Sequence, residues 1–137
     1  MCNQLTTLAT QGETRQIWSC EHGTIHLNWE QITLRLHPQA FKQVVRLVEQ
    51  RVTDLACNKL CAGNCAIISQ ENGFYKFWYS NSMLLLDSPN FYQLVDLVRQ
   101  ADKRLVQLSR GSDKPQRLKQ RYNRWNSTVN SNGFSLN

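Results

Sequence analysis

Apolar and polar residues alternate along two stretches of this chain, from Trp18 to Leu36 and from Ile68 to Leu86. Alternation with a period of two is typical of strands that bury one face. After each stretch, apolar residues recur every three or four positions, as in an amphipathic helix. The pattern therefore predicts a group of strands followed by a helix, twice.

The two stretches are copies of one unit. Shifting the chain by 50 residues aligns residues 17–55 with residues 67–105 without a gap, and 13 of the 39 aligned positions are identical. Such a match indicates an internal duplication. We expect residues 1–110 to form a single α+β domain of two repeats joined by a linker, residues 56–66, with residues 111–137 as a tail.

Each copy is expected to contain three strands joined by two-residue turns. Asn72-Gly73 favours a type I′ turn, and residues 22–23 are its counterpart in the first copy. A two-residue turn there pairs Cys20 with Ile25 and directs Cys20 to the inward sheet face.

A helix follows the strands of each copy. Pro38 suits the first turn of the first helix, where its missing N–H costs nothing, and Asp87 or Ser88 can cap the second. One helix on three strands makes a thin core. The copies are therefore expected to merge into one antiparallel sheet of about six strands, with both helices on one face and a pseudo-twofold axis between the repeats.

The predicted register makes the outward sheet faces of the two copies different. The first is largely polar, whereas the second carries these mainly apolar candidates for partner binding: Ile67, Phe74, Trp78, Met83 and Leu85. An exposed apolar patch usually marks an interface, and Trp is a frequent interface anchor. The sequence therefore predicts a protein partner or a homodimer at this face. The alternative is that the C-terminal segment covers the patch.

The cysteine count is informative about the compartment. Five cysteines is an odd number, and the first residues lack the basic and apolar regions of an export signal. We therefore expect a cytoplasmic protein with reduced thiols or metal ligands rather than structural disulfides.

Three of the cysteines, Cys57, Cys61 and Cys65, recur every fourth residue between the copies. With Cys20 or His22 as a further ligand, they could bind Zn²⁺ or an iron–sulfur cluster. The alternative is that Cys57 and Cys61 act as small apolar residues that pack a helix against the sheet. No other feature of the sequence calls for a cofactor.

Charge is concentrated in the tail. The net charge is +6, of which residues 111–137 contribute +4. The tail is expected to form a short basic helix or to be disordered in part. Its candidate nucleic-acid contacts are basic residues interleaved with aromatic ones: Lys114, Arg117, Lys119, Arg121, Tyr122, Arg124 and Trp125. Such a mixture suits phosphate contact and base stacking, and it also suits an acidic protein surface.

Neither a membrane span nor an enzyme is predicted. No apolar run is long enough to cross a bilayer, and the chain lacks the nucleophile-elbow, zincin, P-loop and dinucleotide motifs. Three hypotheses follow. The favoured one is a non-enzymatic regulatory or adaptor protein that binds a protein partner through the apolar sheet face. The others are a metal or iron–sulfur sensor and a nucleic-acid-binding module.

Overall fold

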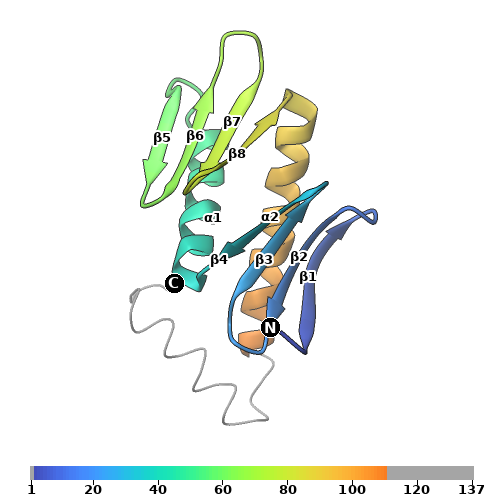
Figure 1. Ribbon diagram of the computed structural model, residues 1–137. Helices are drawn as coiled ribbons and strands as arrows, with labels where there is room; N and C mark the ends of the chain where they lie inside the picture. Colours follow the sequence, from blue (N-terminus) through green and yellow to red (C-terminus); the bar gives the residue numbers. More distant parts are fainter. Residues whose placement is uncertain (1, 111–137) are drawn as a thin grey trace. The chain divides into compact units, whose positions relative to one another are not determined.

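The computed structural model describes residues 2–110, which form two repeats of four strands and a helix (Figure 1). The first repeat comprises β1 (Leu5–Gln11), β2 (Arg15–Cys20), β3 (Ile25–Trp29), β4 (Ile32–Leu36) and α1 (Pro38–Thr53). The second comprises β5 (Lys59–Ala62), β6 (Cys65–Ser69), β7 (Tyr75–Tyr79), β8 (Ser82–Leu86) and α2 (Ser88–Arg110). The predicted α+β class and the duplication of a meander followed by a helix are confirmed.

The prediction of a single sheet of about six strands is wrong. Each repeat forms its own antiparallel sheet, in the order β1-β2-β3-β4 and β5-β6-β7-β8. The additional strands β1 and β5 lie outside the aligned residues 17–55 and 67–105, and β5 belongs to the predicted linker. A fourth strand thus extends each sheet, and the two sheets remain separate.

Cys20 and Thr24 close the turn between β2 and β3, so that its loop has three residues, 21–23, rather than two. The N–H of Gly23 donates to the Cys20 carbonyl at 3.0 Å, and the N–H of Cys20 donates to the Thr24 carbonyl at 3.1 Å. Gly23 has a φ of 86°, which glycine adopts without steric cost and which closes a three-residue hairpin loop. Gly73 has a φ of 87° in the equivalent turn of the second repeat.

This extra turn residue makes the predicted register of the first hairpins wrong by one position. Ser19, not Cys20, pairs with Ile25, and Ser69 pairs with Tyr75. Because a one-residue shift reverses every side chain, Ile17 and Ile67 point inward and are 0% exposed. The predicted outward position of Ile67 is therefore wrong.

The helices begin where the sequence predicts. Pro38 lies in the first turn of α1, whose N-cap is His37. The Asp87 carboxylate accepts the N–H of Asn90 at 2.9 Å and so caps α2. Each helix buries one apolar stripe, formed by Phe41, Val44, Leu47 and Val48 in α1 and by Phe91, Leu94, Val95, Leu97, Val98 and Ala101 in α2.

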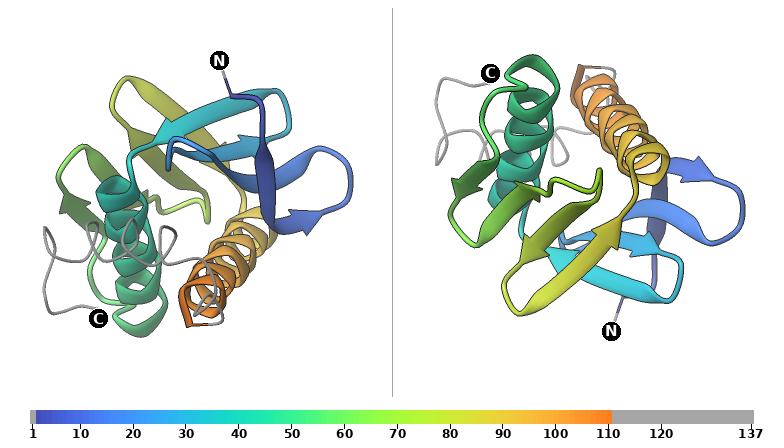
Figure 2. Two further views of the ribbon diagram at one scale, coloured as in Figure 1. Left: turned by 90° about the horizontal axis from the view of Figure 1, so that it is seen from below. Right: turned by 90° about the horizontal axis from the view of Figure 1, so that it is seen from above.

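Each helix contacts the sheet of the other repeat. Helix α1 packs on β5 and β6, and the first turns of α2 are hydrogen-bonded to β1 and β2 (Figure 2). Arg15 of β2 donates to the side chain of Asn90 at 2.9 Å, and Gln11 of β1 donates to the Gln93 carbonyl at 2.6 Å. The helices therefore connect the two sheets.

Equivalent positions of the two repeats meet between the helices. Glu49 of α1 forms an ion pair with Arg99 of α2 at 2.6 Å, and these residues are 50 positions apart. Two clefts show the same relation. One is lined by residues 33–35 and 79–82, and the other by residues 83–86 and 29–32. The residues of one repeat in the first cleft are replaced in the second cleft by the equivalent residues of the other repeat. An approximate twofold axis between the repeats produces this arrangement.

We predict that Arg15→Ala destabilises the fold. Arg15 bonds to α2, pairs with Glu30 at 2.5 Å and stacks over the Trp29 ring at 4.1 Å. Its removal should lower the free energy of unfolding in urea by about 1–3 kcal/mol, because several polar groups lose a partner. Arg35→Ala, at an exposed position of β4, is the control and should change it by less than about 0.5 kcal/mol. Equal effects of the two variants would contradict the assigned contacts.

Candidate metal centre

The segment before β1 passes the end of β2 and the turn that follows it. Leu5 is the partner of Cys20 in the β1–β2 ladder, so the residues immediately before Leu5 lie beside the turn at residues 21–23. Cys2 is among them. The ladder therefore brings two cysteines together although they are 18 residues apart in the sequence.

Glu21 holds this segment against the turn. Its carboxylate accepts the N–H of Asn3 at 2.9 Å and that of Gln4 at 3.1 Å. These donors, with that of Asn3 contributing most, lower the pKa of Glu21 to about 2. Because each carboxylate oxygen already accepts an N–H, we interpret Glu21 as a positioning residue rather than a ligand.

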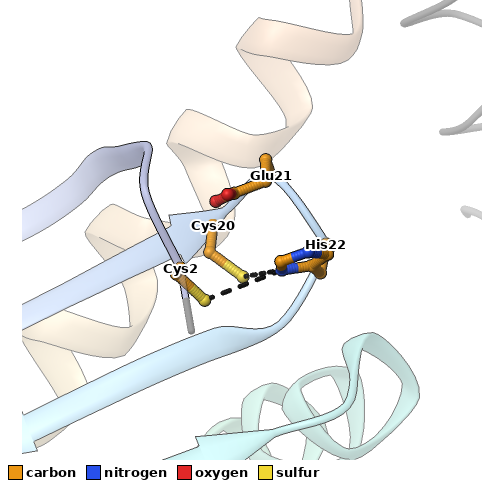
Figure 3. A group of neighbouring side chains, drawn as sticks. All are labelled: Cys2, Cys20, Glu21 and His22. Atoms are coloured by element: carbon orange, nitrogen blue, oxygen red, sulfur yellow. Dashed lines mark hydrogen bonds between the residues drawn. The ribbon is translucent and has the colours of Figure 1, made fainter.

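Two sulfur atoms converge on one imidazole nitrogen. The Nδ1 atom of His22 lies 3.8 Å from the Sγ atom of Cys2 and 3.9 Å from that of Cys20, and both sulfurs point toward His22 in Figure 3. Within residues 2–110, ligand atoms of Cys2, Cys20, Glu21 and His22 all lie within 4.8 Å of one another. One imidazole N–H cannot form good hydrogen bonds to two sulfurs at once. A metal ion between the His22 nitrogen and the two sulfurs could be coordinated by all three atoms.

His26 adds a second imidazole. It belongs to β3, and its Nε2 atom lies 3.7 Å from the Sγ atom of Cys2. The His26 side chain also contributes to the lowered pKa of Cys20. His26 pairs with Trp18 across the β2–β3 ladder, so Cys20, two residues beyond Trp18, reaches the same face. The three-residue turn thus places both groups on the outward face of the first sheet.

The cluster favours one thiolate. Burial by itself would raise the pKa of Cys20, but hydrogen bonds from the side chains of Cys2 and His26 and from the backbone of His22 and Thr24 lower this pKa to about 5. The pKa of Cys2 is raised, first by its hydrogen bond to Cys20 and then by burial. One of the two sulfurs is therefore in the form that binds metals at neutral pH.

The distances fit a tetrahedral zinc site. With Zn–S bonds of about 2.3 Å and Zn–N bonds of about 2.0–2.1 Å, a sulfur and a nitrogen ligand are about 3.6 Å apart. The observed sulfur–nitrogen separations are 3.7, 3.8 and 3.9 Å. Two thiolates and two imidazoles are also a common ligand set for structural zinc. Cys2, Cys20 and His22 could therefore hold Zn²⁺, with His26, whose Nε2 atom approaches the Cys2 sulfur, as the fourth ligand.

The structure separates the cysteines that were predicted to act together. Cys57 precedes β5, and its thiol donates to the Lys59 carbonyl at 3.2 Å. Cys61 pairs with Ala66, the residue after Cys65, so Cys61 and Cys65 lie on opposite faces of the β5–β6 hairpin. Cys61 is exposed, and Cys65 is buried with a pKa raised to about 11 by that burial. The hairpin therefore directs these two thiols away from each other, and of the predicted ligands only Cys20 and His22 belong to the cluster described above.

The candidate partner-binding residues fall into two groups. Ile67 belongs to the core, as its register requires. Phe74 and Leu85 are 37% and 55% exposed, and Trp78 and Met83 are half-buried. Met83 pairs with Trp78 across the β7–β8 ladder. The outward face of the second sheet is therefore apolar even without Ile67.

The candidate nucleic-acid contacts, from Lys114 to Trp125, lie outside the described residues. Within residues 2–110, neither helix has a stretch long and apolar enough to cross a membrane.

The sequence carried one signal for Cys2 that was not used. The aligned repeats contain Cys20 and His22 but not β1, which lies before the first aligned residue. Two cysteines and two histidines in the first 26 residues could have suggested a common site.

Comparison with known proteins found no family model, no curated protein and no solved structure that matches this chain.

Proposed function

We propose that this protein is a zinc-binding protein in which Cys2, Cys20, His22 and His26 hold one Zn²⁺ ion. The observation that carries the proposal is the convergence of the Cys2 and Cys20 sulfurs on the Nδ1 atom of His22, at 3.8 and 3.9 Å, with the Nε2 atom of His26 at 3.7 Å from the Cys2 sulfur. This keeps the metal-binding hypothesis of the sequence and changes its ligands.

The ion would fix the segment before β1 to the rest of the first sheet. Cys2 lies on that segment, Cys20 ends β2, His22 lies in the turn and His26 lies in β3. A site closed by four protein ligands suits a structural or sensing role, because catalytic zinc normally keeps one position open. Occupancy would then determine whether the segment before β1 is ordered, which is how a metal sensor changes its surface.

Comparison with the second repeat supports this assignment, because the same turn forms there without the cysteine and the histidines. The positions equivalent to Cys20, His22 and His26 are Gln70, Asn72 and Lys76, although the turn itself has the same hydrogen bonds. The ligands are thus not needed to form the turn, since the second repeat forms it without them.

We expect the full-length protein, purified anaerobically, to bind one zinc ion, measured by elemental analysis against protein concentration. Cys20→Ser and His22→Asn should lose this ion, the latter without misfolding because Asn72 occupies the equivalent position. Cys61→Ser, at an exposed position, should keep it. Zinc retained by the first two variants and lost from the third would contradict the proposal.

A second prediction concerns Glu21. Glu21→Gln weakens its two hydrogen bonds to backbone N–H groups and should loosen the segment that carries Cys2. Removal of such a supporting partner typically lowers metal affinity by about 10–100-fold, measurable by competition with a chelator. Glu71 occupies the equivalent turn position, so Glu71→Gln is a matched control and should leave the affinity unchanged. The same affinity in both variants would show that Glu21 has no positioning role.

The adaptor hypothesis is retained as a second proposal. It is favoured by the exposure of Leu85, 55%, and of Ile32, 39%, which line one cleft of about 360 Å³ between the sheets. We propose a second copy of the chain as the partner of the face that includes Trp78, Met83 and Leu85. Light scattering coupled to size exclusion should then show a dimer, and Trp78→Ser should give a folded monomer. A wild-type monomer at all concentrations would exclude this dimer.

A further inference from the structure

Cys2 and Cys20 are brought together by the fold, with their sulfur atoms within 4.8 Å of each other. They lie on different segments joined by the β1–β2 ladder. The other thiols have no comparable neighbour, because Cys61 and Cys65 face opposite sides of their hairpin and Cys57 bonds to the backbone.

We propose that Cys2 and Cys20 form a reversible disulfide with each other when the site holds no metal, and that this bond excludes metal binding. The proposal concerns regulation of the zinc site, and its metal-linked part rests on the function proposed above. Disulfide formation itself does not, because it needs only the two thiols and an oxidant.

The step is balanced with a peroxide as the oxidant. The Cys20 thiolate attacks one oxygen of hydrogen peroxide, so that an S–O bond forms, the O–O bond breaks and hydroxide leaves. The thiol of Cys2 then attacks the Cys20 sulfur. The S–S bond forms, the S–O bond breaks and the oxygen leaves as water with the Cys2 proton. The hydroxide takes up the proton that Cys20 released, so two thiols and one peroxide give one disulfide and two waters.

The surroundings allow the sulfurs to approach. A disulfide needs an S–S distance of about 2.05 Å, so the Cys2 side chain must rotate toward Cys20. Cys2 is half-buried and lies outside the regular strands, which leaves it more freedom than a residue within a ladder. Cys20 can remain in place, since it is 7% exposed and already faces Cys2.

Oxidation would remove both sulfur ligands at once. The two imidazoles that remain hold zinc far more weakly than the complete set of four ligands. Conversely, bound zinc occupies both sulfurs and protects them from oxidation. A thiol reductant would break the bond and restore the site. The pair would thus couple metal occupancy to the redox state of the surroundings.

The test uses the full chain, freed of metal under anaerobic conditions and then treated with one equivalent of hydrogen peroxide. Thiols counted after denaturation should fall from five to three, and peptide mapping should find Cys2 linked to Cys20. Dithiothreitol should restore all five. The Cys61→Ser variant should form the same link. The Cys2→Ser variant should not, and should instead leave Cys20 as a sulfenic acid that dimedone traps.

Other outcomes separate this inference from the zinc proposal. A Cys2–Cys20 disulfide in a protein that never binds zinc would support the disulfide proposal and overturn the zinc proposal. Zinc binding without any Cys2–Cys20 link after oxidation would overturn the disulfide proposal and leave the zinc proposal standing. Links that involve Cys57, Cys61 or Cys65 instead would also overturn it.

Discussion

The length of one turn determines both the core and the candidate site. Three residues, 21–23, join β2 to β3, and Gly23 closes the loop with a φ of 86°. With this loop, Ile17 points into the core and is fully buried. Cys20 then reaches the outward face beside His26, where Cys2 meets it. A two-residue turn would reverse β2, expose Ile17 and separate Cys20 from His26.

The repeats share a scaffold but not the chemistry on it. The two turns match in their hydrogen bonds, in their positive-φ glycines and in the pairing of the strands that follow. The helices contact the sheet of the opposite repeat, and Glu49 meets Arg99 between them. Against this common background, the candidate ligands Cys20, His22 and His26 occur in the first repeat, and the apolar outward residues Trp78, Met83 and Leu85 occur in the second. Duplication followed by divergence of the outward faces would produce this pattern, because those faces are not constrained by the shared core.

The sequence predicted the parts of the structure that depend on local spacing. The starts of the two helices, at Pro38 and Ser88, follow from helical periodicity and from residues that suit a first turn or a cap. The first turn was harder, because a glycine at position 23 or 73 suits a two-residue and a three-residue loop alike. The predicted register was therefore wrong by one residue. For this reason Ile67 was expected on the outward face, whereas its side chain points into the core. The contribution of Cys2 depends on β1, which lies outside the repeat and pairs at long range, so that spacing alone could not reveal it.

The most direct test of the account is the coordination of zinc in the full-length protein, measured by X-ray absorption at the zinc edge. A site formed by Cys2, Cys20, His22 and His26 predicts two sulfur neighbours at about 2.3 Å and two nitrogen neighbours at about 2.0–2.1 Å. The Cys2→Ser variant should lose one of the sulfurs. A shell of oxygen and nitrogen alone, or a sulfur count that Cys2→Ser leaves unchanged, would contradict it.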